Sequence, residues 1–384
     1  MENRNIEYGQ VQSPAFVIDQ ARLIRNLQVI KKVQDASGVK VILALKGFST
    51  WPLFPLVKQY LHGATASSLN EARLIKEEMN TLAHTYSPAY FPEDFSELLS
   101  YSSHLTFNSL TQFQQFKDQV VKAQKTVSLG LRVNPEYSEV ETDLYNPAVP
   151  GSRLGVLADQ LPTTLPEAIE GLHVHTLCES SAKATEQLIL ALENKFGSYL
   201  SSLKWVNLGG GHLMTRQDYD LQYLIQVLSA FKQRHPHLEV WMEPGSAIAW
   251  ETGELVSTVL DLVESGGIKT AIVDVSFTAH MPDTLEMPYR PTILGATDAV
   301  PDKPSYRIGG VSCLAGDFME AYSFEKPLQI GDRLVFWDMI HYTMVKSTMF
   351  NGVKHPAIYL MDSEQDTLSL LRTFGYEDFK GRLG

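Results

Sequence analysis

Eight short apolar segments with β-strand character alternate with amphipathic helical segments along residues 41–242. This alternation is typical of parallel strands joined by helices. The expected strands are Val41–Leu45, Ala64–Ser67, Ala83–Tyr86, Leu105–Asn108, Val127–Val133, Gly171–His175, Trp205–Leu208 and Leu238–Met242. The segments between them with helical spacing of apolar residues include Leu69–Met79, Thr111–Val121, Ala182–Phe196 and Tyr219–Lys232. Eight such units in about 230 residues predict an α/β fold of the (β/α)8 barrel type, which typically takes about 250 residues.

After residue 251 the pattern changes to short β-rich segments separated by turns. These segments are Leu255–Val263, Thr270–Val275, Arg307–Val311 and Arg333–Trp337. The strand-like segment Ala15–Asp19 precedes the first barrel helix, so it is expected to complete the second domain. We therefore expect a barrel over residues 20–250 and an all-β sandwich or barrel domain over 1–19 and 251–384. The proline-containing stretch 134–170 breaks the alternation and is expected to form a loop near the barrel mouth.

Charge and composition limit the classes of function. The chain has 32 basic and 44 acidic side chains and a formal charge of −12, which argues against nucleic acid or an anionic membrane as a partner. No segment approaches the roughly 18 apolar residues that span a bilayer, and MENRNIEYGQ lacks an apolar core, so we expect a cytoplasmic protein. Cys178 and Cys313, the only cysteines, are far apart, which predicts neither a disulfide framework nor a zinc site.

Lys46 is the first candidate for chemistry, because active sites of (β/α)8 barrels lie at the C-terminal ends of the strands. It directly follows the first expected strand and precedes Gly47, which leaves room for a bulky group. A lysine desolvated at this position has a lowered pKa and can form an imine with a carbonyl compound. The alternative is an ordinary solvated lysine.

Three successive glycines, Gly209, Gly210 and Gly211, follow the seventh expected strand. Without Cβ atoms, their backbone N–H groups can come close to an anion. Barrels often bind phosphate at this place, so the glycines predict a phosphate-binding loop. A flexible turn is the alternative.

Two histidines and a glutamate end the sixth and eighth expected strands. His173 and His175 are two residues apart, so their side chains are expected to point together into the barrel. We expect no metal there, because neither a carboxylate nor a third histidine stands at matching spacing. Instead, His175 is expected to pack on a planar ligand, and His173 to be a hydrogen-bonded interior residue. Glu243 could hold the nitrogen of a pyridine ring protonated, or it could be a capping or surface glutamate.

Together these positions resemble the alanine racemase-like, fold type III family of pyridoxal-phosphate enzymes, which includes the ornithine and diaminopimelate decarboxylases. The chain is most similar to the branch that decarboxylates carboxynorspermidine or carboxyspermidine to norspermidine or spermidine in polyamine biosynthesis. The similar stretches run from residue 44 to residue 353. They are ALKGF, GLHVHTLCE, NLGGGH, AHMPDTLEMPYRP, GGVSCLAGD and DMIHYTMVKSTMFNGV.

The resemblance implies pyridoxal 5'-phosphate as the cofactor, held as a Schiff base on Lys46. It implies that His175 stacks on the pyridine ring, and that Glu243 pairs with the ring nitrogen and also borders the substrate. The phosphate would be held by residues 209–211 with help from the hydroxyl group of Tyr342.

The resemblance also implies a homodimer with shared active sites. Cys313 would enter the site of a second subunit and act on the substrate carbon after carbon dioxide leaves. Asp317 lies in the same segment and would bind substrate, and Asp283 would recognise the distal amine of the polyamine.

One residue departs from the family pattern, and other members of the fold remain as alternatives. Ser246 follows the Glu-Pro-Gly turn, where ornithine decarboxylases carry an arginine that reaches the phosphate and the carboxynorspermidine branch often carries a glutamate. The alternatives are a decarboxylase for diaminopimelate, ornithine or arginine, a non-catalytic pyridoxal-phosphate-binding relative, and a racemase. The presence together of four expected site residues favours an active decarboxylase over the non-catalytic relative. They are Lys46, Glu243, Cys313 and Tyr342.

Overall fold

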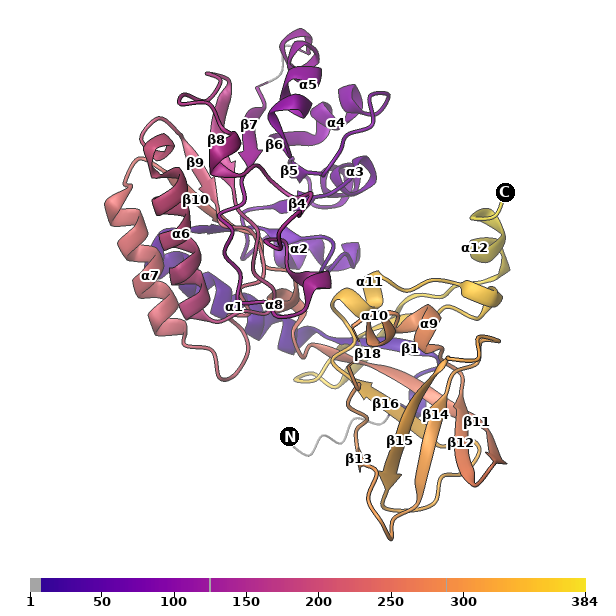
Figure 1. The fold of residues 1–384 in the computed structure, drawn as a ribbon. Coiled ribbons are helices and arrows are strands. Elements are labelled where there is room, and N and C mark those ends of the chain that lie inside the picture. The colour runs from indigo at the N-terminus through magenta and orange to yellow at the C-terminus, as the bar shows by residue number, and fades with distance from the viewer. Residues whose placement is uncertain (1–7, 124–125, 288) are drawn as a thin grey trace. The chain divides into compact units, whose positions relative to one another are not determined.

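The computed structural model describes residues 8–123, 126–287 and 289–384. Residues 1–7 of the expected second domain and Pro288 of the AHMPDTLEMPYRP stretch therefore lie outside the described residues. The chain divides into two compact units (Figure 1). We call Arg25–Ile248 the barrel unit, and Met1–Ile24 with Ala249–Gly384 the sheet unit.

Parallel strands in a closed ring form the centre of the barrel unit. They are β2 (Lys40–Val41), β3 (Leu43–Ala44), β4 (Ala64–Ala66), β5 (Ala83–Tyr86), β6 (Ser102–Phe107), β7 (Ser128–Arg132), β8 (Ile169–His173), β9 (Trp205–Asn207) and β10 (Glu239–Met242). β2 and β3 are halves of one strand interrupted at Ile42, because β2 pairs with β10 while β3 pairs with β4. Counted as one, they close an eight-stranded barrel. The predicted (β/α)8 fold is confirmed.

Helices surround this ring (Figure 1). They are α1 (Gln20–Ser37), α2 (Phe54–Val57), α3 (Leu69–Glu78), α4 (Phe95–Tyr101), α5 (Leu110–Lys122), α6 (Ala182–Leu200), α7 (Leu221–Arg234) and α8 (Ser246–Ala249). Four of them begin at a polar side chain that accepts a hydrogen bond from a backbone N–H of the first turn. These N-cap residues are Ser68, Ser109, Ser181 and Asp220.

The connection between β7 and β8 contains only two 3₁₀ turns, η3 (Asp143–Tyr145) and η4 (Ala158–Gln160). The connection begins at the C-terminal end of β7 and comes back to it at Val156, which forms an isolated bridge with Val133. The amide of Asn108 also donates to the carbonyl oxygen of Arg153 over 2.8 Å. The expected irregular loop at the barrel mouth is therefore present.

Large side chains fill the N-terminal end of the ring. A Cβ atom at Gly130 or Gly171 would lie within 2.3 Å of the Trp205 ring, so both glycines make room for this indole. The rings of His84 and His104 stack 3.8 Å apart, and His84 also meets Trp241 at 4.4 Å. Because this end is packed, a ligand must enter from the C-terminal ends of the strands.

The sheet unit is a mixed sheet in the strand order β13-β15-β14-β12-β11-β1-β17-β18, with β16 on β11. Its strands are β1 (Ala15–Asp19), β11 (Gly253–Ser265), β12 (Ile268–Val273), β13 (Ala296–Asp298), β14 (Ser305–Gly309), β15 (Phe318–Phe324), β16 (Arg333–Trp337), β17 (Ala357–Asp362) and β18 (Thr367–Arg372). β1 is buried throughout and lies between β11 and β17. The expected completion of the second domain by the N-terminal strand is confirmed.

The description of the second domain as all-β needs one correction. Short helices of four to six residues interrupt the strands: α9 (Phe277–His280), α10 (Asp283–Glu286), α11 (Tyr342–Val345) and α12 (Tyr376–Gly381). One helical turn is too short to produce a detectable hydrophobic period. Several expected functional residues lie in or beside these turns.

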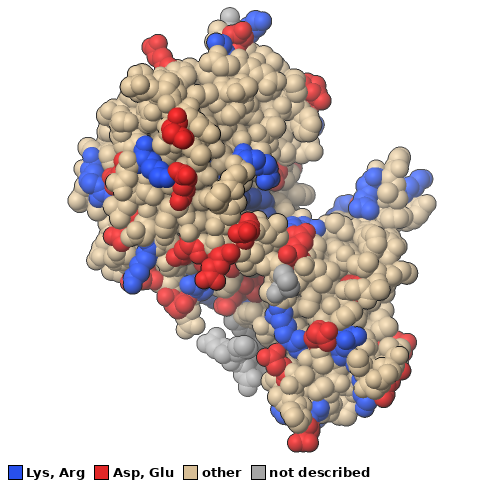
Figure 2. Space-filling view, viewed as in Figure 1, with Lys and Arg blue, Asp and Glu red and all other residues tan. Residues whose placement is uncertain are grey.

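Among the described residues, no helix has both the length and the apolar character needed to cross a membrane. On the face seen in Figure 2, acidic and basic side chains are interspersed, which suits the modest excess of acidic residues in the sequence.

Candidate active site

A cavity at the C-terminal ends of the barrel strands brings together side chains from distant parts of the barrel unit. Its lining residues are Leu45, Lys46, Thr65, Ser67, Tyr86, Pro88, Arg132, His173, His175 and Glu243. The expected catalytic lysine, both histidines and the glutamate are therefore in one place. The glycine loop reaches the same place through His175 and Glu243.

Lys46 lies in the turn that follows β3. A Cβ at the next residue, Gly47, would lie 2.6 Å from the Cα of Gly245, so this turn requires glycine to pack against the end of β10. The amine of Lys46 faces the cavity and is solvent-accessible, but protein surrounds the cavity closely. Burial, followed by the charge of Arg132, lowers the pKa of Lys46, while Glu243 acts in the opposite direction. A lowered pKa favours the neutral, nucleophilic amine.

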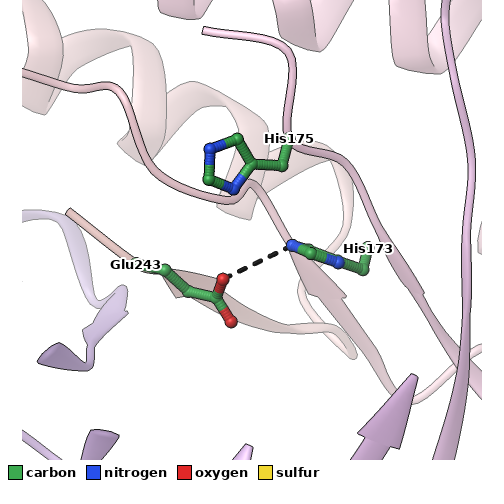
Figure 3. Close-up of side chains that lie close together, drawn as sticks. All are labelled: His173, His175 and Glu243. Atoms are coloured by element: carbon green, nitrogen blue, oxygen red, sulfur yellow. Dashed lines mark ion pairs between the residues drawn. The ribbon is translucent and has the colours of Figure 1, made fainter. Parts of the chain in front are cut away.

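Glu243 is a buried carboxylate that faces His173 (Figure 3) and also contacts Asn207. Its Oε1 accepts a hydrogen bond of 2.6 Å from Nδ2 of Asn207, and its Oε2 lies 3.4 Å from Nε2 of His173. Burial alone would raise the pKa of Glu243, but His173, Asn207 and Lys46 outweigh burial, so the pKa is lowered. The ionised form suits a partner for a protonated ring nitrogen.

His175 lies two residues beyond the end of β8, and its ring stands over the Glu243 carboxylate in Figure 3. Its Nδ1 accepts a hydrogen bond from the N–H of Gly210 over 3.3 Å. Burial and the charges of Lys46 and Arg132 hold the pKa of His175 well below its usual value. A neutral ring fixed at one nitrogen can stack on a planar ligand.

The expectation for His173 is correct in part. This histidine is buried in the interior, but neither ring nitrogen forms a hydrogen bond of good geometry with the described residues. It instead faces Glu243, and its ring meets the edge of Tyr86 at 5.3 Å. Burial lowers its pKa, so the contact with Glu243 is a polar contact of a neutral imidazole.

The two histidines and Glu243 could also hold a metal ion, because their ligand atoms lie within 4.8 Å of one another. The sequence argument against a metal rested on the absence of a third ligand at matching spacing. That argument missed Glu243, because this residue comes from β10, two strands away in the ring. We continue to expect no metal, because Lys46, with its lowered pKa, lines the same cavity and suits an organic cofactor that carries a carbonyl group.

The glycine loop after β9 has no room for side chains. A Cβ at Gly209 would lie 2.3 Å from the carbonyl oxygen of Val174. At Gly210 it would lie 2.5 Å from the carbonyl oxygen of Glu243, and at Gly211 it would lie 2.2 Å from that of Leu177. The N–H groups of Gly209 and Gly210 already donate to Asn207 and His175. The loop thus lets the backbone lie directly against the cavity residues, and phosphate binding by it stays a prediction.

Arg132 is a cavity residue that the sequence analysis missed. It ends β7, its Nη2 donates to the carbonyl oxygen of His175 over 2.8 Å, and its guanidinium stacks 4.6 Å from the centre of the Tyr86 ring. The expected strand Val127–Val133 hid it, although a charged residue near the end of an apolar strand was a usable signal. Arg132 places a positive charge beside the amine of Lys46.

Ser246 begins α8, and its hydroxyl group donates to Oε1 of Glu179 over 3.4 Å. A carboxylate therefore neighbours the position that departs from the family pattern. Phosphate anchoring by the glycine loop and Tyr342 stays a prediction.

In the sheet unit, the structure joins Asp283 to the segment of Tyr342. Asp283 begins α10 and is buried, and its Oδ2 accepts hydrogen bonds from Oγ1 of Thr343 over 2.6 Å and from the hydroxyl of Tyr289 over 3.1 Å. Its Oδ1 is buried without a hydrogen-bond partner among the described residues. A buried carboxylate oxygen without a donor calls for a partner, and a cation would provide one.

Cys313 and Asp317 occupy one loop of the sheet unit but have different surroundings. Cys313 is exposed, whereas Asp317 is 4% exposed. Both carboxylate oxygens of Asp317 accept hydrogen bonds from backbone N–H groups of the same unit. Substrate binding by Asp317 stays a prediction. Its hydrogen bonds show that it holds the backbone of this loop.

The barrel cavity fits pyridoxal phosphate. It offers an amine with a lowered pKa, an ionised buried carboxylate and a neutral imidazole, which match the aldehyde, the ring nitrogen and the ring face of the cofactor. Next to them is a loop in which any Cβ would collide with the cavity wall. A parallel barrel with this lysine, followed by a sheet domain, defines the class of pyridoxal-phosphate-dependent decarboxylases with the fold of alanine racemase.

The chain belongs to this family. The family model described as "Pyridoxal-dependent decarboxylase, C-terminal sheet domain" matches residues 15–340. The protein is thus a pyridoxal-phosphate-dependent carboxy-lyase, as the sequence analysis predicted.

Two relatives and one crystal structure place the chain within the family. It is 52% identical to a carboxyaminopropylagmatine decarboxylase of Synechocystis sp., over 99% of this chain and 97% of the relative. It is 42% identical to a carboxynorspermidine/carboxyspermidine decarboxylase of Campylobacter jejuni, over 98% and 99%. The crystal structure of carboxynorspermidine decarboxylase from Campylobacter jejuni, complexed with norspermidine, matches with a TM-score of 0.88 and 40% identity, covering 97% of this chain and all of that one.

Proposed function

We propose that the enzyme removes carbon dioxide from a carboxylated polyamine, carboxynorspermidine or carboxyspermidine, in polyamine biosynthesis. The observation that carries the proposal is the cavity in which Lys46 meets Glu243 and His175. The similarity to relatives that act on these compounds supports the choice of substrate.

Bound pyridoxal phosphate supplies an electron-accepting ring that takes the electron pair left when carbon dioxide departs. The chain's own residues prepare that step. Lys46, with its lowered pKa, provides the neutral amine that joins the cofactor and is later displaced by the substrate amine. Glu243 provides the negative charge that holds a ring nitrogen protonated, and Asn207 fixes its orientation. His175 provides a flat neutral surface against the ring.

The family resemblance assigns further roles to three residues of the sheet unit. We propose that Asp283 binds a distal ammonium group of the substrate through its unpaired Oδ1. Tyr342 would help to hold the phosphate. Cys313 would donate its thiol proton to the carbon that has lost carbon dioxide, and solvent would then restore the thiol. These roles follow the family resemblance, and Asp283 gains support from the hydrogen bonds that orient it.

We further propose a homodimer in which Cys313 serves the site of the second subunit. Mixing two defective variants tests this sharing. Lys46→Ala and Cys313→Ala homodimers should each be impaired, whereas random mixing after mild dissociation should restore about a quarter of the native activity, because half the dimers would contain one intact site. Mixtures no more active than the separate variants would refute shared sites. The cytoplasmic location and the absence of a nucleic-acid partner stay predictions.

A second candidate substrate is carboxyaminopropylagmatine, which the 52% identity to the Synechocystis relative favours. Its reacting end is the same as that of carboxyspermidine, and its distal end carries a guanidinium group in place of an amine. A planar guanidinium presents five N–H donors, whereas an ammonium group presents three at one point. The chemistry at Lys46 is therefore equal for all these substrates, and residues that meet the distal end decide between them.

A substrate panel tests the proposal. The purified holoenzyme is incubated with carboxynorspermidine, carboxyspermidine, carboxyaminopropylagmatine, ornithine, arginine and diaminopimelate, and kcat/KM is measured for release of each amine. We expect the carboxylated polyamines to exceed the amino acids by at least about a hundredfold, because only they reach the distal carboxylate. Equal or higher kcat/KM for diaminopimelate, ornithine or arginine would refute the proposed substrate class.

Borohydride reduction and peptide mapping test the lysine. The reduced cofactor should be found on the peptide that contains Lys46, and Lys46→Ala should lose both the label and turnover. Lys183→Ala changes an exposed lysine of α6 and serves as the matched control, which should retain both. A label elsewhere in the chain would refute the assignment.

A further inference from the structure

Asp317 ties the loop that contains Cys313 to the rest of the sheet unit. Its Oδ1 accepts hydrogen bonds from the N–H of Phe277 over 2.7 Å and from that of Thr278 over 3.1 Å. Its Oδ2 accepts one from the N–H of Ser312 over 3.1 Å, directly before Cys313. One buried carboxylate therefore joins the first turn of α9 to the Cys313 loop.

The two ends of this loop also meet through the backbone. The N–H of Gly310 donates to the carbonyl oxygen of Asp317 over 2.7 Å, and a Cβ at Gly310 would lie within 2.5 Å of the Asp317 carboxylate. The loop from 310 to 317 is thus closed at its base, and its closing residue is a buried acid. Buried carboxylates need such donors, because an unpaired charge in this position would be costly.

A second residue holds the tip of the loop. The N–H of Cys313 donates to Oδ1 of Asn351 over 2.8 Å. Asn351 has a φ of 57°, a left-handed conformation that asparagine tolerates better than most residues. Asn351 is the central residue of the FNG segment after α11. The sequence alone assigns this asparagine no role.

We propose that Asn351 and Asp317 are positioning residues that fix the Cys313 thiol for proton transfer to the substrate carbon. The two anchors hold the backbone that leads into an exposed cysteine, at Ser312 through Asp317 and at Cys313 itself through Asn351. With the two peptide groups before its Cα held in place, Cys313 has a fixed Cα position and a narrowed range of directions for its thiol. The inference rests on the proposed role of Cys313, and it assigns to Asp317 a positioning role in place of the expected substrate contact.

The chain provides a clean test of Asn351. Asn351→Gly keeps the left-handed backbone and removes only the side-chain acceptor, because glycine adopts positive φ readily. Asn351→Asp restores an acceptor oxygen and should rescue the function. Asn80→Gly is the matched control, since Asn80 also has a positive φ, of 48°, and lies in the barrel unit.

Two measurements on the holoenzymes decide the proposal. The first is the ratio of normal amine product to the amine form of the cofactor, which accumulates when the proton reaches the cofactor instead of the substrate carbon. We expect Asn351→Gly and Asp317→Ala to increase the abortive product about tenfold or more, approaching Cys313→Ala, because a correctly placed donor contributes at least that factor. Asn351→Asp and Asn80→Gly should stay near the native ratio.

The second measurement is the pH profile of Cys313 alkylation by iodoacetamide, followed by peptide mass spectrometry. Cys178 lies in the barrel unit and is an internal control. We expect the rate at Cys313 to change severalfold in Asn351→Gly while the rate at Cys178 stays constant. Glu320→Ala, which removes an exposed carboxylate of β15, controls for Asp317→Ala.

Native values of both measurements in Asn351→Gly and Asp317→Ala would overturn the inference. A changed alkylation rate with a native product ratio would overturn it too, provided that Cys313→Ala itself alters the ratio. If Cys313→Ala leaves the product ratio native, the proposed catalytic role of Cys313 fails instead. In that case the alkylation profile alone decides whether these two residues position the thiol.

Discussion

Asn207 holds Glu243 by a hydrogen bond of 2.6 Å from Nδ2 to Oε1, and its own Oδ1 accepts the N–H of Gly209 over 2.8 Å. One amide side chain at the end of β9 therefore fixes both the orientation of the Glu243 carboxylate and the backbone at the start of the glycine loop. Neither contact could be read from Trp205–Leu208, which has the appearance of an ordinary buried strand.

Replacement of Asn207 should weaken catalysis without removing the lysine. Asn207→Ala removes a hydrogen bond to a charged group, worth about 2 kcal/mol, so kcat/KM should fall roughly 10- to 100-fold. Asn207→Asp should be worse, because two carboxylates at this distance cannot both stay ionised. Steady-state kinetics measure both, with the exposed Asn194→Ala of α6 as control. A native kcat/KM in Asn207→Asp would contradict this role.

The glycine loop predicts a contrast between two glycine-to-alanine changes. In Gly210→Ala the new Cβ would lie 2.5 Å from the carbonyl oxygen of Glu243 and 3.1 Å from Cε1 of His175. We expect at least about 1 kcal/mol of destabilisation from overpacking and a clear loss of cofactor affinity. Gly197→Ala lies in α6 with nothing within 4 Å of its Cβ, so it should stabilise by about 0.5 to 1 kcal/mol. Thermal unfolding and cofactor titration compare them, and equal behaviour of the two variants would contradict the packing argument.

Arg132 should set the pH at which Lys46 reacts. Its positive charge helps to lower the pKa of Lys46, so its removal in Arg132→Gln should raise that pKa. The pH profile for reconstitution of apoenzyme with cofactor should then move to higher pH. Arg132→Lys keeps the charge and should shift the profile less, although it loses the planar contact with Tyr86. A profile of Arg132→Gln that overlays the native one would exclude this electrostatic role.

The histidine pair at the barrel floor predicts loss of stability in acid. Burial lowers the pKa of His104 to about 4, and it holds that of His84 well below the usual 6.5. The unfolded chain binds these protons first, so the stability is complete above about pH 6.5 and declines as the pH falls toward 4. Each such histidine contributes at most about 1.4 kcal/mol per pH unit in this window.

His104→Gln tests this prediction, because glutamine does not titrate. Unfolding of the native protein and the variant is followed at pH 7 and pH 5 by the fluorescence of Trp205 and Trp241, whose rings lie 5.4 and 5.7 Å from that of His104. The variant should lose less stability between the two pH values. Equal losses would show that His104 does not titrate on unfolding in this range.

The sequence predicts the barrel and half of its cavity for a simple reason. Lys46, the glycine loop and Glu243 each follow an apolar strand, and parallel strands of a barrel end at one face. The same rule was not applied to Arg132, whose charge near the end of an apolar strand was a usable signal, and it does not reveal Asn207, which lies inside the apolar segment Trp205–Leu208. In strands that are buried on both faces, the hydrophobic pattern does not show which side chains point inward.

Other parts of the molecule depend on contacts between distant segments. Trp205 fills the space left by Gly130 and Gly171, which belong to two other strands, and only their pairing brings the three together. The bonds of Asp317 likewise join residues 40 positions apart. Contacts of this kind depend on which distant segments pack together, and a single sequence does not reveal that.

The position of β1 affects the order in which the chain can fold during synthesis. Ala15 pairs with both Val256 and Ala357, so the first strand to leave the ribosome waits for partners made after the whole barrel unit. Its five apolar or buried residues stay exposed during that interval, whereas the barrel can close on contacts of its own. A nascent chain halted before β11 begins at Gly253 should therefore carry a folded barrel and an unpaired apolar strand, which is a natural target for a chaperone.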